Sequence, residues 1–230
     1  MSDHLKIVNN NATNSIPMLR AMVGIGILCA MLIVVTYEGT LPRIERLKAE
    51  ALQEAIFQVV PGVKTTKSFA YSESNGFREA TNQDKQDNLV YAGYNEDSEF
   101  VGLAIDASGQ GYADIIRILY GYNPETQTIV GFYVLESKET PGLGDKIQKD
   151  DNFLSNFIEM SAKLSTDLNA LENKIVTVKS GTKVNPWEID GISGATISSR
   201  AIGEIINKSS SYWIPKLYKH KNDFLIQPNE

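Results

Sequence analysis

Cysteine and histidine are nearly absent from this chain of 230 residues, and several kinds of chemistry are excluded with them. A single cysteine, Cys29, cannot form an intramolecular disulfide, a cysteine zinc site or an iron–sulfur cluster. The two histidines, His4 and His220, lie near opposite termini, and we expect both to be solvated tail residues. No G-x-S-x-G segment is present to supply a hydrolase nucleophile. We therefore expect neither a metal site nor hydrolase chemistry.

An excess of positive charge is also lacking. The formal net charge is −6, whereas a protein that binds the phosphate backbone of nucleic acids needs a basic surface. The composition is otherwise that of a folded protein, with 42% hydrophobic and 22% charged residues. Nucleic acid is thus excluded as the expected partner, and one folded domain with an appendage is the expected organisation.

The appendage is the uncharged run at residues 21–36, AMVGIGILCAMLIVVT. At about 1.5 Å rise per residue, a helix of this length nearly spans a hydrocarbon core of roughly 30 Å. A buried core helix and a cleaved signal peptide are the alternatives, but the run is longer than a usual signal core and no A-x-A-like cleavage site follows. We predict a transmembrane helix at residues 18–37, after an N-terminal tail at 1–17. Basic residues flank it on both sides, so they do not decide its orientation.

The chain beyond the anchor alternates between helical and strand patterns. Residues 38–62 are predicted to form an amphipathic connector helix that Pro42 opens and Pro61-Gly62 ends, although a plain core-facing helix fits equally well. Residues 72–88 are polar and indicate a surface loop or hairpin end. Strands are predicted at 89–94, 99–105, 115–121, 128–135 and 175–178, and helices around 153–164 and at 201–213. This pattern predicts an α+β or mixed α/β domain over residues 63–215, with a C-terminal tail at 216–230.

Two short segments contain residue types that suit a ligand site. The first is Glu139-Thr140-Pro141-Gly142-Leu143-Gly144, where glycines on either side of one apolar side chain let the backbone approach a flat ligand. An ordinary strand-to-helix loop is the alternative. The second is Asp190-Gly191-Ile192-Ser193-Gly194-Ala195-Thr196, which precedes a helical pattern. Small residues clear space around Thr196, and a helix start offers free N–H groups to a phosphate. The alternative is an ordinary N-cap formed by Thr196 or Ser198.

The second segment matches the flavinylation pattern D-x-x-(S/T)-G-A-(T/S) at every constrained position. With the first segment and the anchor, it resembles the FMN-binding domain shared by two membrane subunits. These are the G subunit of the Rnf electron-transport complex and the C subunit of the sodium-pumping NADH:quinone reductase. Residues 138–147 and 193–201 are more similar to the Rnf subunit. The resemblance covers the anchor and nearly the whole domain.

The resemblance implies a covalent cofactor. A separate magnesium-dependent FMN transferase would esterify Thr196 with the phosphate of FMN. The residues that would be recognised in this reaction, or that would leave space around Thr196, are Asp190, Ser193, Gly194 and Ala195. Residues 139–144 would form the pocket edge around the isoalloxazine, where Thr140 donates a hydrogen bond and Leu143 packs against the ring. Lys179 and Lys183 are candidates to neutralise the phosphodiester, although solvated surface lysines are the simpler interpretation.

The resemblance further implies a subunit of an ion-translocating electron-transport complex of the ferredoxin:NAD type, with no substrate site of its own. Its partners would be other membrane and iron–sulfur subunits. It would be a single-pass protein of the inner membrane, with the tail at 1–17 in the cytoplasm and the main domain on the periplasmic side. Two alternatives stay open: a flavin-free anchor or assembly subunit, and a stand-alone extracytoplasmic flavin reductase or related sensory domain.

Overall fold

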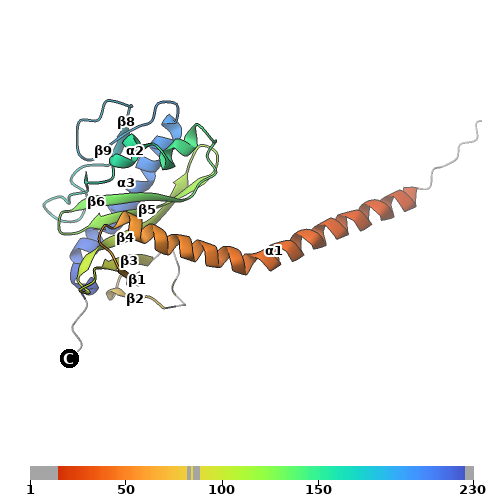
Figure 1. Cartoon of the computed structure of the whole chain (residues 1–230), viewed down its shortest axis with the longest axis horizontal. Helices are drawn as coiled ribbons and strands as arrows, with labels where there is room; N and C mark the ends of the chain where they lie inside the picture. The colour runs from red at the N-terminus through yellow and green to blue at the C-terminus, as the bar shows by residue number, and fades with distance from the viewer. Residues whose placement is uncertain (1–14, 82–83, 85–88, 226–230) are drawn as a thin grey trace, which may run out of the picture. The chain divides into compact units, whose positions relative to one another are not determined.

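The chain divides into two compact units, residues 1–49 and residues 50–230. The structure, a computed structural model, describes residues 15–81, 84 and 89–225 (Figure 1). All described residues of the first unit belong to helix α1 (Ser15–Val59). By length and composition, α1 is able to cross a membrane, and its apolar side chains around the predicted span are exposed.

Helix α1 has no break at Pro42, where we expected the connector helix to open. A proline removes one backbone hydrogen bond from a helix but does not oblige the chain to leave it. The helix ends at Val59, just before the predicted Pro61-Gly62 stop, and Gly62 takes a positive φ of 86°.

The second unit is built on an antiparallel sheet of seven strands in the order β2-β1-β3-β4-β5-β6-β7. These strands are β1 (Thr65–Ser72), β2 (Gly76–Glu79), β3 (Leu89–Tyr94), β4 (Phe100–Gln110), β5 (Ile115–Asn123), β6 (Thr128–Glu136) and β7 (Met160–Ser161). A separate parallel pair joins β8 (Val176–Val178) to β9 (Glu188–Asp190). The helical elements are η2 (Gly144–Gln148), α2 (Asp151–Ser155), α3 (Thr196–Lys219) and η3 (Lys221–Phe224). Helices and an antiparallel sheet in one domain confirm the α+β class.

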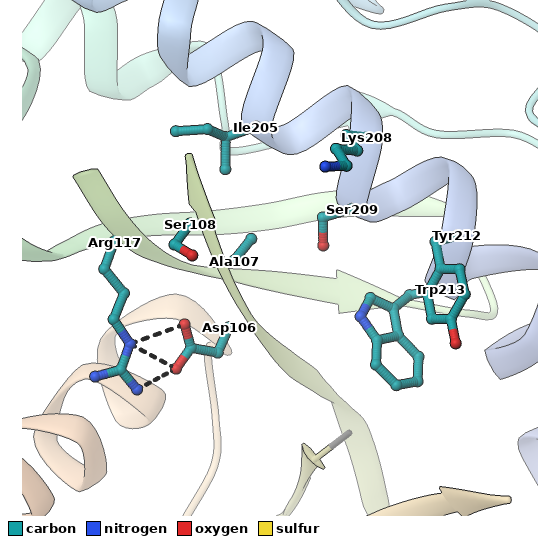
Figure 2. A pocket seen from close by; sticks show the side chains of 9 residues that line it. All are labelled: Asp106, Ala107, Ser108, Arg117, Ile205, Lys208, Ser209, Tyr212 and Trp213. Atoms are coloured by element: carbon teal, nitrogen blue, oxygen red, sulfur yellow. Dashed lines mark hydrogen bonds and ion pairs between the residues drawn. The ribbon is translucent and has the colours of Figure 1, made fainter. Parts of the chain in front are cut away.

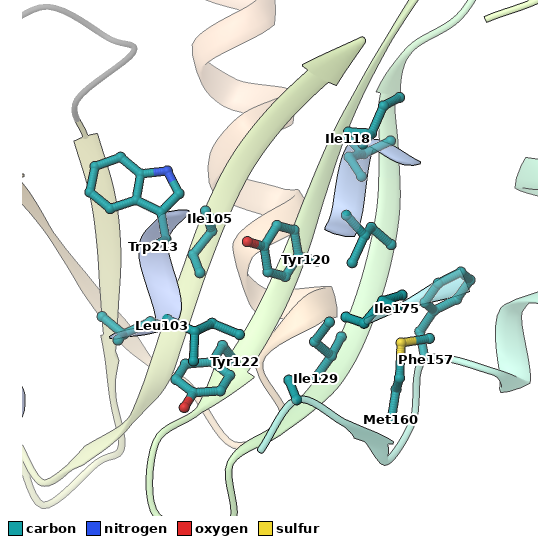
Figure 3. Close-up of a cluster of buried hydrophobic side chains, with 14 of the residues drawn as sticks. Leu103, Ile105, Ile118, Tyr120, Tyr122, Ile129, Phe157, Met160, Ile175 and Trp213 are labelled. Atoms are coloured by element: carbon teal, nitrogen blue, oxygen red, sulfur yellow. The ribbon is translucent and has the colours of Figure 1, made fainter. Parts of the chain in front are cut away.

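Both faces of the sheet are covered, because alternate residues of each strand point to opposite sides. Helix α3 covers one face and forms the larger core, which includes Leu103, Tyr120 and Trp213 (Figure 3). Residues 55–63 cover the other face, over a smaller cluster that contains Ala104 and Leu119. The end of α1 is therefore core-facing and not only a connector.

Two glycines let the end of α1 lie directly on the sheet. A Cβ at Gly121 or Gly131 would clash with the backbone carbonyl of Val59. The two glycines are paired across β5 and β6, so this part of the sheet has no side chains that would separate it from the helix end.

The polar segment at 72–88 includes the turn of a hairpin, in agreement with one of the two expected alternatives, a hairpin end. Strands β1 and β2 pair there, and Gly76 lies beyond their turn with a φ of 71°. Residues 82, 83 and 85–88 lie outside the described residues. The helix expected around 153–164 is only the short α2, and the chain then forms β7.

The expected C-terminal tail at 216–230 differs most from the structure. Helix α3 continues to Lys219, and η3 follows it. Phe224 is fully buried, its carbonyl accepts a hydrogen bond from Tyr94 Oη at 2.8 Å, and Asp223 accepts one from the Phe77 amide at 3.0 Å. His220 is half-buried against the Phe77 ring and is not a solvated tail residue. Apolar contacts and hydrogen bonds therefore hold this segment to the domain up to Phe224.

Candidate functional site

Thr196 is the first residue of α3, reached by a short connection from the end of β9. In that connection Gly194 has a φ of 85°, and no atom lies within 4 Å of where its Cβ would be. Ala195 is buried and fixes the start of the helix, whereas Thr196 is exposed. The Gly-Ala pair thus presents the threonine hydroxyl to solvent without a neighbouring side chain in the way.

Among the described residues, no side chain caps this end of α3, contrary to the ordinary N-cap that the sequence left open. Two nearby hydroxyls are used elsewhere. Ser198 Oγ donates to Glu139 Oε2, and Ser199 Oγ donates to the Ala195 carbonyl at 2.8 Å while accepting from the Ile192 amide at 3.1 Å. The positive end of a helix of 24 residues therefore faces the surface beside Thr196, where an anion is favoured.

Two pockets meet at Thr196. The first has a volume of about 360 Å³ and brings the two predicted segments together. Its lining residues are Tyr112, Glu139, Thr140, Leu143, Gly144 and residues 194–198. The second has a volume of about 440 Å³ and lies against the β8–β9 pair. Its lining residues are 177–180, 191–194, Thr196 and Arg200. Thr196 and Gly194 line both.

The first pocket has an apolar rim. Tyr112, Leu143 and Ile197 line it with exposed fractions of 64%, 51% and 55%. Pro141 and Gly142 are in the exposed turn before Leu143 and line neither pocket, and the positive φ of 77° at Gly142 explains the glycine there. A large exposed apolar rim next to a polar attachment point suits a flat ring with a polar tail.

The second pocket is basic. Lys179 and Arg200 line it beside Thr196, and within the described residues neither side chain has an ion-pair or hydrogen-bond partner. Lys183 does not belong here, because its Nζ donates to Asn156 Oδ1 at 2.9 Å in a different pocket. Arg200 was missed by the sequence reasoning, although its position one helical turn after Thr196 was a usable signal.

Asp190 lines neither pocket at Thr196. One of its carboxylate oxygens accepts from the amides of Gly181 and Thr182 at 2.8 and 3.3 Å. It therefore shapes the turn that carries Lys179. Ser193 lines the second pocket and a neighbouring one that Asp190 shares, but not the apolar-rimmed pocket.

A larger pocket, of about 600 Å³, lies between α3 and strands β4 and β5 (Figure 2). The Asp106–Arg117 ion pair, Lys208 and Trp213 line it, and hydrogen bonding to Asp106 raises the pKa of Arg117. None of the residues in the two predicted segments reaches it. Among the described residues, no cluster of three acidic, histidine or cysteine side chains is placed to hold a metal ion.

Comparison with known proteins agrees with this geometry. Residues 111–211, which include both predicted segments, match the family described as the FMN-binding domain. The crystal structure of the C subunit of a Na⁺-translocating NADH-quinone reductase from Parabacteroides distasonis has a similar fold. Its TM-score is 0.56 and its sequence identity 19%, over 81% of this chain and 98% of that one. The class defined by fold and site is thus that of an FMN-binding domain carried behind an N-terminal helix.

Relatives that align with most of the chain identify a family within this class. The chain is 29% identical over 196 residues to the G subunit of the ion-translocating oxidoreductase complex of Methanosarcina acetivorans, which covers 83% of this chain and 90% of the relative. It is 30% identical over 184 residues to the corresponding G subunit from Haemophilus influenzae, covering 77% and 80%. The chain belongs to the family of G subunits of ion-translocating oxidoreductase (Rnf) complexes, as the resemblance of its motifs indicated.

Proposed function

We propose that FMN is esterified through its phosphate to Thr196 Oγ and that the chain relays electrons through it within a membrane-bound complex. The observation that supports this most is the position of the hydroxyl. Thr196 is exposed at an uncapped helix start, between an apolar-rimmed pocket and a basic one. The arrangement fits both ends of FMN, an apolar ring system and a phosphate.

The burial of the neighbouring hydroxyls supports Thr196 as the attachment point. Ser198 and Ser199 are 3% and 0% exposed, and each donates its proton to a buried acceptor. Neither is accessible to another protein. Ser193 is exposed but does not line the apolar-rimmed pocket. Of the hydroxyls in this segment, Thr196 alone combines exposure with access to both pockets.

The two pockets divide the cofactor between them in this proposal. Tyr112, Leu143 and Ile197 cover a face or edge of the isoalloxazine, and the amide groups at the start of α3 face the phosphate. Lys179 and Arg200 offset its negative charge. The phosphodiester then lies where the helix dipole and two cations favour it, and partners can approach the outer ring edge.

Attachment needs no catalytic base from this chain. Thr196 Oγ forms a bond to the phosphorus of the flavin half of FAD, and the bond between the two phosphates breaks. AMP leaves, and the hydroxyl proton passes to the magnesium-dependent FMN transferase. The chain contributes an exposed, fixed hydroxyl and an open approach, which the positive φ of Gly194 provides.

The cofactor supplies the redox chemistry when bound, and the protein supplies its position and electrostatic surroundings. A covalent link keeps the effective concentration of flavin at its site high where no free FMN can replace it. This suits a domain outside the cytoplasm, held by α1 to the inner membrane beside the other membrane and iron–sulfur subunits. The two pockets at one exposed hydroxyl argue against a flavin-free assembly subunit, which needs no ligand site. The similarity to subunits of a larger complex favours an electron relay over a stand-alone reductase.

The test is the mass of the full chain after expression with a competent FMN transferase. The unaltered chain gains the mass of one FMN minus one water, and Thr196→Val gains nothing. The matched control Thr196→Ser keeps a hydroxyl at the attachment position, which the pattern D-x-x-(S/T)-G-A-(T/S) accepts, and keeps the mass gain. Modification of the Thr196→Val chain would refute the attachment point.

A further inference from the structure

Glu139 is the one buried acidic side chain among the described residues, with an exposed fraction of 6%. It begins the loop that forms one wall of the apolar-rimmed pocket. Burying a carboxylate is costly unless its oxygens are hydrogen-bonded. Both are: Oε1 accepts from the Ala113 amide at 3.0 Å, and Oε2 accepts from Ser198 Oγ.

The space around this carboxylate is fitted to it. A Cβ on Gly111 would lie 2.5 Å from Oε1, and a Cβ on Gly144 would lie 2.5 Å from Oε2 and 2.7 Å from Ser198 Oγ. Two glycines from different segments therefore leave room for one carboxylate. Both oxygens of this side chain are therefore held by groups of the chain itself.

Three walls of the pocket meet at this carboxylate. Ala113 adjoins the rim residue Tyr112, Gly144 adjoins the rim residue Leu143, and Ser198 lies in the first turn of α3, two residues after Thr196. We infer that Glu139 is a positioning residue that fixes the first turn of α3, and thereby the Thr196 hydroxyl, against the pocket wall. The inference rests on the proposed attachment at Thr196. It assigns Glu139 a role through Ser198 and not as a ligand of the ring.

The test measures FMN attachment to the full chain in detergent, with purified transferase, FAD and Mg²⁺, at a temperature where every variant is folded. The rate is followed by intact mass while the concentration of the acceptor chain is varied. Because a shift of about 1 Å in a reacting group can cost on the order of a hundredfold in rate, we expect Glu139→Ala to lower the rate at saturating acceptor by about tenfold or more. The acceptor concentration for half-maximal rate stays the same, since the exposed recognition surface is unchanged.

Two further variants isolate the contact. Ser198→Ala lowers the maximal rate similarly, and the double variant with Glu139→Ala loses little more, because both remove the same link. Glu139→Gln recovers much of the rate lost in Glu139→Ala, since an amide can accept from the Ala113 N–H and donate to the Ser198 hydroxyl. These milder variants answer the question even if Glu139→Ala does not fold.

Asp106→Asn is the matched control for a purely structural role. It weakens a partly buried ion pair with Arg117 on the same sheet, away from Thr196. We expect a lower unfolding midpoint with an unchanged attachment rate. If Glu139→Ala and Ser198→Ala behave like this control, the positioning role is refuted while the proposed function stands. If the unaltered chain itself takes up no FMN in the same assay, the proposed function fails instead.

Discussion

Gly144→Ala is the change that best tests the tight packing behind the attachment site. The added methyl would lie 2.5 Å from Glu139 Oε2, 2.7 Å from Ser198 Oγ and 2.9 Å from Glu139 Cβ. These atoms cannot move aside freely, because Glu139 and Ser198 are buried and hydrogen-bonded to each other. Overpacking of this kind costs about 1–3 kcal/mol. For a domain of this size, each kcal/mol lowers the unfolding midpoint by roughly 2–4 °C.

The assay pairs thermal unfolding, followed by circular dichroism, with the rate of FMN attachment to the folded chain. We expect Gly144→Ala to lower both. Gly62→Ala is the matched control, because its cost of about 1–2 kcal/mol comes from the positive φ of 86°. No atom lies closer to its Cβ than Val101 Cγ1 at 4.0 Å, and its attachment rate is expected to stay unchanged. If Gly144→Ala unfolds and accepts FMN like the unaltered chain, the described packing around Glu139 is wrong.

Three other predictions concern the C-terminal segment, the stability of the fold at alkaline pH and the basic pocket. Phe224→Ala is expected to cost about 3–5 kcal/mol in denaturant unfolding, because the ring is fully buried against Phe77; a loss below about 1 kcal/mol would return residues 216–230 to the status of a tail. Burial, and secondarily the charge of Glu79, raises the pKa of Tyr94 to about 12. The fold therefore favours the neutral phenol. The contribution of Tyr94 to the free energy of unfolding is complete below the unfolded pKa of about 10 and is lost as pH rises toward 12. A free energy of unfolding that does not change across that pH range would contradict this prediction. Replacing Lys179 and Arg200 together by glutamine is expected to slow FMN attachment and weaken its salt dependence, whereas an unchanged rate at low and high salt would remove both from the phosphate site.

The sequence predicted the central strands well because their composition leaves few alternatives. Strand β3 matches its predicted bounds, and β4, β5 and β6 lie where apolar β-formers are bounded by turn residues. Strands β1 and β2 were missed because both are partly polar and half exposed, and β2 forms the edge of the sheet. Their register is decided by pairing with β3, which is information from distant sequence.

The helical ends were harder to predict for a similar reason. Phe224 is buried by partners more than a hundred residues earlier, so its local polar neighbours gave a misleading signal. Pro42 was taken as a helix start because proline favours that position, yet it lies inside α1. In both cases tertiary context or helix continuity outweighed a local preference.

The candidate site was only partly visible in the sequence. Small residues before Thr196 and the glycine-rich loop at 139–144 are local signals, and the structure brings both to one pocket. Tyr112 carries no local signal, and Lys179 was named only as a candidate beside Lys183, because both residues reach Thr196 through strand pairing. The Gly191 amide bond to the Val178 carbonyl, at 3.1 Å, is one of the contacts that place Lys179 there.

Peptide mapping by mass spectrometry of the chain isolated from its own membrane tests the central claim most directly. The account predicts that the peptide containing Thr196 carries one FMN in phosphoester linkage, with the peptide's serines unmodified. A chain with no flavin on that peptide, or with flavin on another residue, would contradict it.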